Sequence, residues 1–282
     1  MDDFALFILT NNRADRVLTY KSLRKQGYTG KIVLLIDDED PEYDRYFELY
    51  DDQVQVFNKK QWVKRTDDGD NFKTNRGVIY ARNANFAIAK QMGLKYFMQY
   101  DDDYSHYRYH RDENNELITK GTHYIGDLDS VFKVLLDYFK KIPAKAIAIA
   151  QSGDFIGGVN SGMHYVLKRK IMNSFIFDVD KPVDFVGRIN EDLTTSVVLG
   201  HRGELCFTIP IVSLIQKPTQ QNKGGMTELY LDNGTYVKSF YSVIYQPSAV
   251  KVAMMGTRHK RLHHKVSWKN TASCVIREEY KK

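Results

Sequence analysis

Cysteines and long apolar segments are scarce in this sequence. Its 282 residues include only two cysteines, Cys206 and Cys274, which provide neither a disulfide framework nor a cysteine metal cluster. No apolar run approaches the roughly 20 residues that span a bilayer. The acidic start, Met1–Phe4, lacks the basic residues and the apolar stretch of a signal peptide. We therefore expect a cytoplasmic protein with reduced thiols and no membrane contact.

Acidic residues are missing from the C-terminal part of the chain. The overall composition, with 43% hydrophobic and 27% charged residues, is ordinary for a soluble globular protein and excludes wholesale disorder. The formal net charge is +6, and the segment Gln246–Arg277 carries seven Lys or Arg residues and no Asp or Glu. A local basic excess indicates a polyanion or a phosphate-bearing ligand. A solubilising tail would have the same charge and stays open as the alternative.

Strand-like and helix-like segments alternate along the chain. The expected strands are the apolar runs 4–9, 31–36, 54–57, 94–100 and 146–150. The expected helices cover 13–25, 77–92, 129–140 and 191–199. This order predicts an α/β fold in which helices flank a mostly parallel sheet. Ligands of such folds gather at the carboxyl ends of the strands, where the loops 10–13, 37–40 and 101–103 lie.

Three consecutive aspartates, Asp101–Asp103, follow the expected strand 94–100. Alternate residues of an extended segment point the same way, so Asp101 and Asp103 could converge on one cation. Hard divalent ions such as Mg²⁺ and Mn²⁺ prefer oxygen ligands of this kind. A solvated acidic turn is the alternative, but three carboxylates at the end of a buried strand repel one another, and a cation would relieve that repulsion.

The order of several motifs resembles the GT-A glycosyltransferases. Ala81–Asn83, Ala87 and Gly93, followed by the aspartate triplet, match the Ala-Arg-Asn…Ala…Gly…Asp-x-Asp pattern of those enzymes. Asn190–Asp192 resembles their acidic catalytic-base segment, so the likeness spans residues 4–215. The resemblance implies a GT-A fold with a mixed, mostly parallel sheet, a nucleotide-sugar donor and a divalent metal.

A narrower set of segments resembles the TET-associated glycosyltransferases. Gly77–Asn83, Tyr100–Tyr104 and Arg261–Trp268 carry this likeness. The group includes phage enzymes and the kinetoplastid base J glucosyltransferase, which glycosylate hydroxymethylated pyrimidines in DNA. The resemblance implies transfer of glucose or N-acetylglucosamine from a UDP-sugar to 5-hydroxymethylcytosine or 5-hydroxymethyluracil in DNA, in the host cytoplasm if the chain is encoded by a phage. A GT-A enzyme acting on a surface glycan or a protein, and an inactive nucleic-acid-binding module, remain alternatives.

The resemblance also implies roles for individual residues. Asp101 and Asp103 would bind Mn²⁺ or Mg²⁺, although which two of the three aspartates bind the ion stays open. His263 or His264 would either add a ligand or belong to a phosphate-facing patch. Asp192, or else Glu191, would be the general base, although acidic residues are also favoured at a helix N-terminus. The expected donor contacts are Thr10, Asn11, Arg13, Asp38, Arg82, Asp102 and Gly158. The expected acceptor and DNA contacts are Tyr104, His106, Arg108, Arg258, Lys260, Arg261 and Lys265.

Each of these roles has a structural alternative. Helix capping and plain turns explain the polar residues of the first loops equally well, and Arg82 could form a salt bridge to a nearby aspartate. Packing of surface tyrosines competes with acceptor binding in the segment 104–111. We expect residues 1–215 to form the catalytic core and residues 216–282 to form a mobile loop plus a basic C-terminal segment packed on the same domain. Within the second part, 217–226 is either a lid over the donor or a passive linker.

Overall fold

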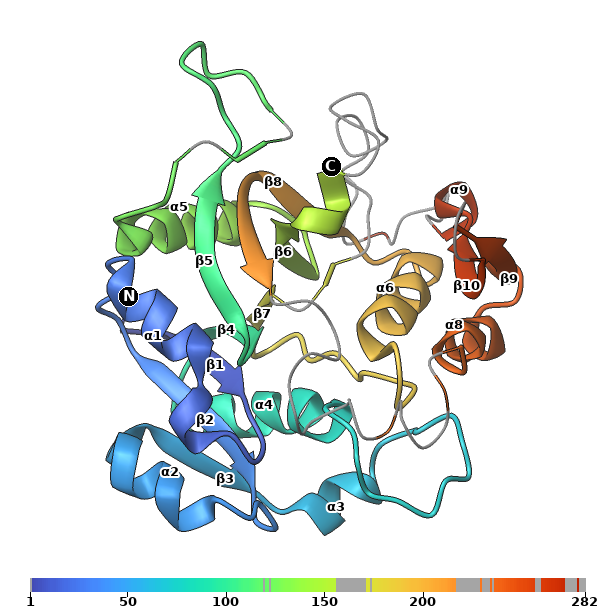
Figure 1. Ribbon diagram of the computed structural model, residues 1–282, viewed down its shortest axis with the longest axis horizontal. Helices are drawn as coiled ribbons and strands as arrows, with labels where there is room; N and C mark the ends of the chain where they lie inside the picture. Colours follow the sequence, from blue (N-terminus) through green and yellow to red (C-terminus); the bar gives the residue numbers. More distant parts are fainter. Residues whose placement is uncertain are drawn as a thin grey trace.

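The computed structural model describes residues 2–118, 120–121, 123–155, 171–172, 174–216, 229, 234, 236–256, 260–271 and 278. The main sheet has the strand order β3-β2-β1-β4-β7-β6-β8-β5 (Figure 1). Its strands are β1 (Phe4–Leu9), β2 (Ile32–Asp37), β3 (Val54–Phe57), β4 (Tyr96–Asp101), β5 (Tyr104–Tyr109), β6 (Ala146–Gln151), β7 (Ser174–Asp178) and β8 (Cys206–Gln216).

The pairing of the strands is mixed. β3, β2, β1 and β4 are parallel neighbours, and β6 is parallel to β8. β7 is antiparallel to both β4 and β6, and β5 is antiparallel to β8. The predicted α/β fold with a mixed, mostly parallel sheet is therefore confirmed.

Helices lie on both faces of this sheet. The α-helices are α1 (Leu18–Lys25), α2 (Tyr43–Tyr50), α3 (Lys59–Val63), α4 (Ile79–Gln91), α5 (Leu128–Lys141), α6 (Glu191–His201), α8 (Lys238–Tyr245) and α9 (Trp268–Thr271). The short 3₁₀ helices are η1 (Ala14–Arg16), η2 (Asp51–Gln53) and η3 (Ser152–Phe155). The expected helix 13–25 is thus divided into η1 and α1. No helix in the described ranges is both long and apolar enough to cross a membrane.

Strand β1 shows why the strands appear in the sequence as continuous apolar runs. Phe4, Leu6 and Ile8 join the core cluster that includes residues of α1, α2 and α5. Ala5, Phe7 and Leu9 face the other way, into the cluster formed with α4. A strand buried on both faces needs apolar residues at every position. Accordingly, every residue of β1 is buried.

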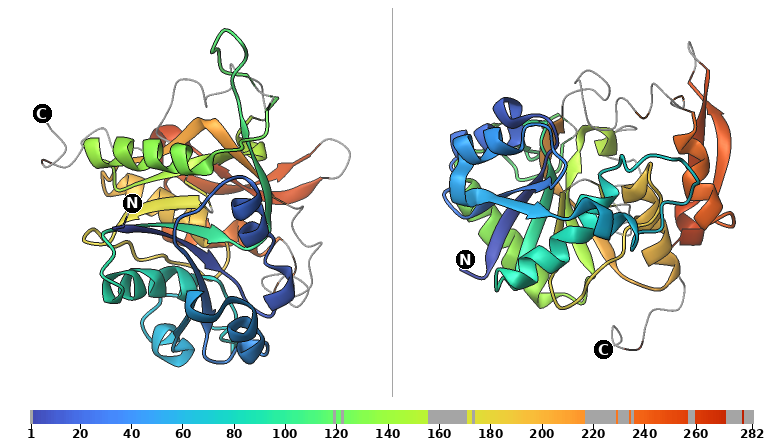
Figure 2. Two further views of the ribbon diagram at one scale, coloured as in Figure 1. Left: turned by 90° about the vertical axis from the view of Figure 1, so that its left-hand side faces the viewer. Right: turned by 90° about the horizontal axis from the view of Figure 1, so that it is seen from below.

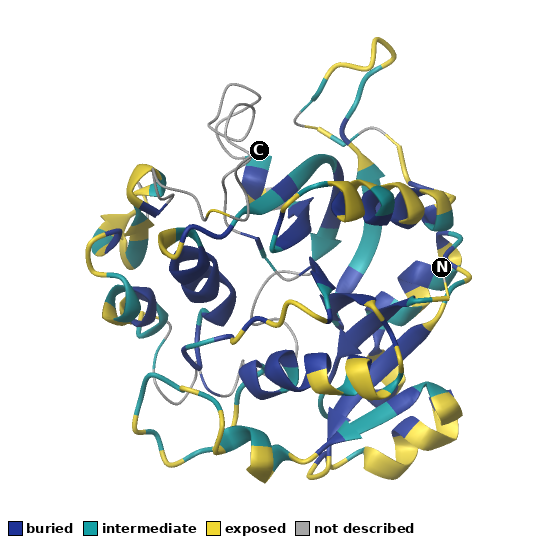
Figure 3. Ribbon diagram, turned by 180° about the vertical axis from the view of Figure 1, so that it is seen from behind, coloured by how far each residue is buried: buried dark blue, intermediate teal, exposed yellow. Residues whose placement is uncertain are grey.

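The C-terminal part forms a smaller unit beside α6. The strands β9 (Val250–Met255) and β10 (Arg261–Val266) pair in an antiparallel ribbon that packs against α8, and the ribbon projects at one edge of the molecule (Figure 2). Leu193 and Val197 of α6 share an apolar cluster with Val250 and Val266 of the ribbon. α6 is buried along nearly its whole length, whereas α2 is largely exposed (Figure 3).

Candidate active site

The first loop and the aspartate triplet lie side by side because their strands pair. β1 and β4 are parallel, with Leu9 opposite Asp101, so Thr10 and Asp102 emerge together at the carboxyl edge of the sheet. The Thr10 hydroxyl donates to Asp102 Oδ2 over 2.9 Å, and Arg13 Nη1 donates to Asp102 Oδ1 over 2.7 Å. Burial raises the pKa of Asp102, while Arg13 and the Thr10 hydroxyl oppose that rise. These three predicted donor residues therefore form one cluster.

A hollow lined by charges of both signs adjoins this cluster. It has a volume of about 230 Å³ and is lined by Arg13, Asp15, Arg16, Leu18, Lys21, Asp102 and Asp103. Its three cations, Arg13, Arg16 and Lys21, suit a phosphate-bearing ligand, and its aspartates would need a cation between them and such a ligand. Sequence reasoning missed Arg16 and Lys21, because nothing but proximity to Asp103 distinguishes them from other exposed cations.

The other two predicted donor residues of the early loops support the loops themselves. Asn11 Nδ2 donates to Asp37 Oδ2 over 3.2 Å and to Asp40 Oδ2 over 3.1 Å. Asp38 accepts a hydrogen bond from Asn58 Nδ2 over 2.7 Å and another from a backbone N–H over 2.9 Å. In this structure Asn11 and Asp38 thus hold the early loops in place, which is the structural role given above as the alternative to donor binding.

Arg82 of α4 connects the triplet with the start of α6. Its Nε donates to Glu191 Oε1 over 2.7 Å and its Nη2 donates to Asp101 Oδ1 over 3.0 Å. Its Nη1 also donates to Gln99 Oε1 over 3.1 Å. The side chain is only 1% exposed. The guanidinium is therefore enclosed, and the predicted salt bridge to an aspartate is present together with a second one to Glu191.

Two carboxyl groups of the site have strongly raised pKa values. Burial raises the pKa of Glu191 to about 7, with Asp192 adding to the rise and Arg82 opposing it. Burial also raises the pKa of Asp103 to about 7, and the neighbouring charges of Asp101 and Asp102 raise it further. Such carboxyls exchange protons near neutral pH, which is typical of catalytic and cation-binding sites.

The start of α6 is held in an unusual conformation. Asn190 precedes the helix with φ +65°, in the left-handed region that few residues other than glycine adopt. Glu191 and Asp192 occupy the first turn, both are buried, and Asp192 Oδ1 accepts the Leu193 backbone N–H over 2.6 Å. The helix N-terminus favours the negative charge of Glu191 and Asp192. Stabilising the start of the helix in this way is compatible with a role as general base.

The predicted metal ligands do not all come together. His264 Nδ1 lies 3.2 Å from Asn190 Nδ2, and His263 Nδ1 donates to the His264 carbonyl oxygen over 2.8 Å. Within the described residues, no three His, Cys, Asp or Glu side chains are arranged to hold a metal ion. The two histidines, of which either could add a ligand, thus contact Asn190 and the β10 backbone, and Asp101 and Asp103 stay the predicted ligands of the ion.

The predicted acceptor residues have different environments. The Tyr104 side chain is fully buried, with its ring 5.5 Å from that of Tyr100, so it serves the core rather than an acceptor surface. His106 is partly buried with its ring 4.9 Å from Tyr124, and Arg108 lies over the same tyrosine at 4.7 Å. Lys260, Arg261 and Lys265 are exposed on or beside β10. Gly158, Arg258 and the segment 217–226 lie outside the described residues.

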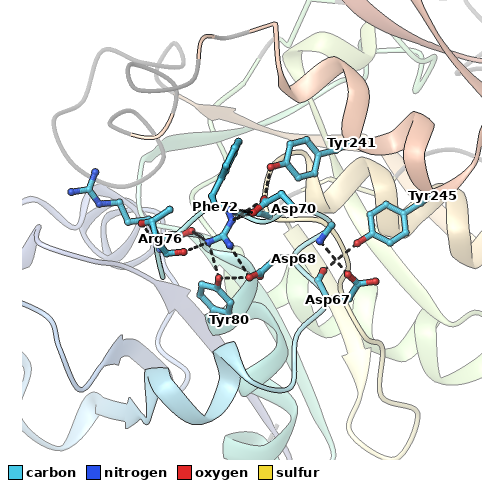
Figure 4. A network of polar contacts seen from close by, with 11 residues as sticks. Asp67, Asp68, Asp70, Phe72, Arg76, Tyr80, Tyr241 and Tyr245 are labelled. Carbon is cyan, nitrogen blue, oxygen red and sulfur yellow. Dashed lines mark hydrogen bonds and ion pairs between the residues drawn. The ribbon is translucent and has the colours of Figure 1, made fainter.

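A second polar network lies beside the site and was not predicted. Arg188 is 1% exposed and donates to Asp68 Oδ2 over 2.7 Å and to Asp70 Oδ2 over 2.9 Å. Asp68 also accepts from the Tyr80 hydroxyl over 3.0 Å, and Asp70 accepts from the Tyr241 hydroxyl (Figure 4). The partners of Arg188 lie more than a hundred residues away from it in sequence, so local patterns contain no sign of this network.

Comparison with known proteins identifies the class. The model of the TET-associated glycosyltransferase family matches residues 4–225, and the chain belongs to this family. The protein is thus a glycosyltransferase, as predicted. No curated protein matches the chain.

Several solved structures have a similar chain path at low identity. Glucosyl-3-phosphoglycerate synthase from Mycobacterium tuberculosis, in complex with Mn²⁺, UDP and phosphoglyceric acid, is 9% identical, with 96% of this chain and 88% of that chain covered and a TM-score of 0.46. TarS from S. aureus with UDP-GlcNAc is 11% identical, with coverages of 86% and 67% and a TM-score of 0.44. The mannosyltransferase PcManGT from Pyrobaculum calidifontis, with GDP-Man and Mn²⁺, is 10% identical, with coverages of 86% and 73% and a TM-score of 0.46.

Proposed function

We propose that the protein transfers a sugar, glucose or N-acetylglucosamine, from a UDP-sugar to the 5-hydroxymethyl group of a pyrimidine in DNA. The observation that carries the proposal is the Arg82 bridge, which brings the aspartate triplet and the Glu191 carboxylate into one site. Family membership supports sugar transfer. In this reaction the acceptor oxygen bonds to the anomeric carbon, the bond from that carbon to the diphosphate breaks, and the acceptor proton passes to a base.

Asp192 is our choice for that base. Glu191 is committed through Oε1 to Arg82, whereas Asp192 Oδ1 accepts the weaker backbone hydrogen bond from Leu193. Asp192 also lies near the C-terminal unit. Burial and the charge of Arg261 lower the pKa of Lys238, and the charge of Asp192 opposes this shift. The base thus adjoins the cations on which we expect DNA to lie. A proton transferred to Asp192 would leave the acceptor oxygen free to attack.

The aspartate triplet fits a hard divalent ion. Asp101 and Asp103 offer oxygen ligands. Burial raises the pKa of Asp103 to about 7, and the charges of Asp101 and Asp102 raise it further, so a cation beside them would be favourable. Mg²⁺ and Mn²⁺ are usually held by one or two carboxylates together with substrate phosphates, so further protein ligands are not required. When bound, the ion would neutralise the charge that develops on the leaving diphosphate. Asp102 instead accepts hydrogen bonds from Thr10 and Arg13. These bonds would hold the loop 10–13 beside the phosphates of a bound donor.

The β9–β10 ribbon offers a surface for the DNA backbone. Val250 pairs with Val266, and both belong to the apolar cluster with α6, so that face of the ribbon is covered. Alternation places Lys251, Lys265 and Arg261 on the opposite face, where all three are exposed. Lys251 and Lys265 are directly opposite each other, and like charges in that position repel unless an anion lies between them.

A transfer assay tests the proposal. The protein is incubated with Mn²⁺, labelled UDP-glucose or UDP-N-acetylglucosamine, and duplex DNA that contains 5-hydroxymethylcytosine or 5-hydroxymethyluracil. Duplexes with 5-methylcytosine or thymine are matched controls because they lack only the hydroxyl. We expect label on the hydroxymethylated duplexes alone, and Asp192→Asn should lower its rate of appearance. Transfer to a glycan or a protein, with none to any duplex, would contradict the choice of acceptor.

A further inference from the structure

The Arg188 side chain joins separate parts of the chain at one point. It donates through Nε to both oxygens of Asp70, over 2.9 and 3.2 Å, and through Nη2 to Asp68 Oδ2 over 2.7 Å. Through Nη1 it reaches the Tyr80 hydroxyl oxygen over 2.8 Å and the backbone carbonyls of Thr74 and Arg76. A buried guanidinium with this many acceptors has a single orientation, since its donors form a rigid fork.

The same network reaches the C-terminal unit. The Tyr241 hydroxyl of α8 donates to Asp70 Oδ2, the oxygen that also accepts from Arg188 Nε (Figure 4). One turn further along α8, the Tyr245 hydroxyl donates to the Asp67 backbone carbonyl over 3.3 Å. Tyr241 therefore shares an acceptor oxygen with Arg188, whereas Tyr245 interacts with Asp67 and with the backbone of Gly187 and does not bind an acceptor of the Arg188 side chain.

This network and the site share two pieces of backbone. On α4, Tyr80 belongs to the network and Arg82 to the site, two residues apart. On the segment that leads into α6, Arg188 belongs to the network and Glu191 to the site, three residues apart. We expect a shift of Arg188 relative to Tyr80 to displace Glu191 relative to Arg82.

The conformation of Asn190 makes the segment that leads into α6 depend on the Arg188 network. This residue lies between Arg188 and Glu191 and has φ +65°, a conformation that costs an asparagine energy unless the surroundings enforce it. Its side chain contacts Ser242 Oγ of α8 over 3.1 Å, next to Tyr241. The turn into the catalytic segment is thus held on one side by Arg188 and on the other by α8.

We infer that Arg188, tied to α8 through Asp70 and Tyr241, is a positioning residue that sets where Glu191 and Asp192 lie relative to Arg82 and Asp101. Arg188 acts through these residues and takes no part in proton transfer. The inference rests on the proposed role of the Glu191–Asp192 pair. It predicts that loosening the network lowers kcat, because displacing a catalytic group by about 1 Å can cost on the order of 100-fold in rate. The donor site around Thr10, Arg13 and Asp102 should be unaffected.

The test compares Tyr241→Phe with Tyr245→Phe. Both changes remove one hydroxyl from α8, but only the first removes a hydrogen bond to an acceptor that the Arg188 side chain also binds. We expect Tyr241→Phe to lower kcat by about tenfold, with the donor KM changed by less than about twofold. Tyr245→Phe should change both constants by less than about twofold. Asp70→Asn keeps the shape of the acceptor, weakens the same link, and should reproduce the loss of kcat.

Thermal unfolding and donor hydrolysis complete the design. The melting temperatures of Tyr241→Phe and Tyr245→Phe should differ by no more than a few degrees, so that a kcat difference reports positioning rather than folding. Equal kcat values for the two variants, or a loss confined to KM, would overturn the inference. The constants are measured with whichever acceptor the wild type uses and also for the slow hydrolysis of the UDP-sugar. Failure of the wild type on DNA would refute the proposed acceptor and would leave this comparison intact.

Discussion

Replacing Glu191 by Gln should alter how the stability of the protein depends on pH. Burial raises the pKa of Glu191 from its ordinary value of 4.5 to about 7. One pKa unit corresponds to about 1.4 kcal/mol, so ionising Glu191 costs the folded state about 3 kcal/mol more than it costs the unfolded chain. The ion pair with Arg82 is already included in this net value, because it opposes the rise.

The sign of the effect follows from the raised pKa. Because the folded state holds the Glu191 proton to higher pH than the unfolded chain, this group stabilises the protein fully below about pH 4.5. That contribution is lost as the pH rises through about 7. Glutamine is neutral throughout, so Glu191→Gln should gain about 3 kcal/mol relative to the wild type between pH 4.5 and pH 8.

Urea unfolding at several pH values measures this gain. Metal is removed with a chelator so that ion binding does not enter the comparison. Glu48→Gln serves as the control, because Glu48 is exposed and pairs with Arg45 on the surface. Its difference curve from the wild type should be flat. A flat curve for Glu191→Gln, or one that falls with rising pH, would refute the electrostatic description of the site.

Three further outcomes follow from the structure. Arg82→Met should lower the unfolding free energy at pH 8 by about 3–5 kcal/mol, because it leaves the buried carboxylates of Asp101 and Glu191 without their cation. Urea unfolding measures this loss, and a value below about 1 kcal/mol would contradict the prediction. Asp192→Asn should reduce kcat by at least about 100-fold while the donor KM changes little, which steady-state kinetics would measure; near-normal kcat would exclude Asp192 as the base. Lys265→Ala should reduce the slope of log affinity for DNA against log salt by about 1, as determined by fluorescence anisotropy, whereas an unchanged slope would remove the ribbon from the DNA contact.

The sequence predicts those parts of the fold that rest on local pattern. β1, β2, β4 and β6 are buried on both faces, so their apolar runs stand out. β5 was missed because its tyrosines alternate with polar residues and suggest a loop that binds an acceptor. Tyr104 and Tyr107 instead point into the core, where they pack with Tyr100. The insertion of β7 antiparallel between β4 and β6 is a tertiary arrangement that no local pattern specifies.

The site shows the same division between local and distant signals. Asp101–Asp103 could be placed at the end of a strand and Glu191 at the start of a helix, since each position depends on neighbouring residues. The Arg82 bridge joins side chains 109 residues apart, and the Arg188 network spans a similar separation. The place of His263 and His264 relative to the triplet could not be predicted for a related reason, because the path of β10 depends on packing against α8 and α6.

The identity of the acceptor is the central claim, and the mass of the modified nucleoside tests it most directly. Hydroxymethylated duplex DNA is treated with the protein, Mn²⁺ and a mixture of UDP-sugars, then digested to nucleosides and analysed by mass spectrometry. We predict a new nucleoside whose mass equals that of the hydroxymethylated pyrimidine plus one transferred sugar residue, absent when Asp192→Asn replaces the wild type. An unchanged set of nucleosides with every UDP-sugar, from protein that transfers sugar to another acceptor, would contradict the account.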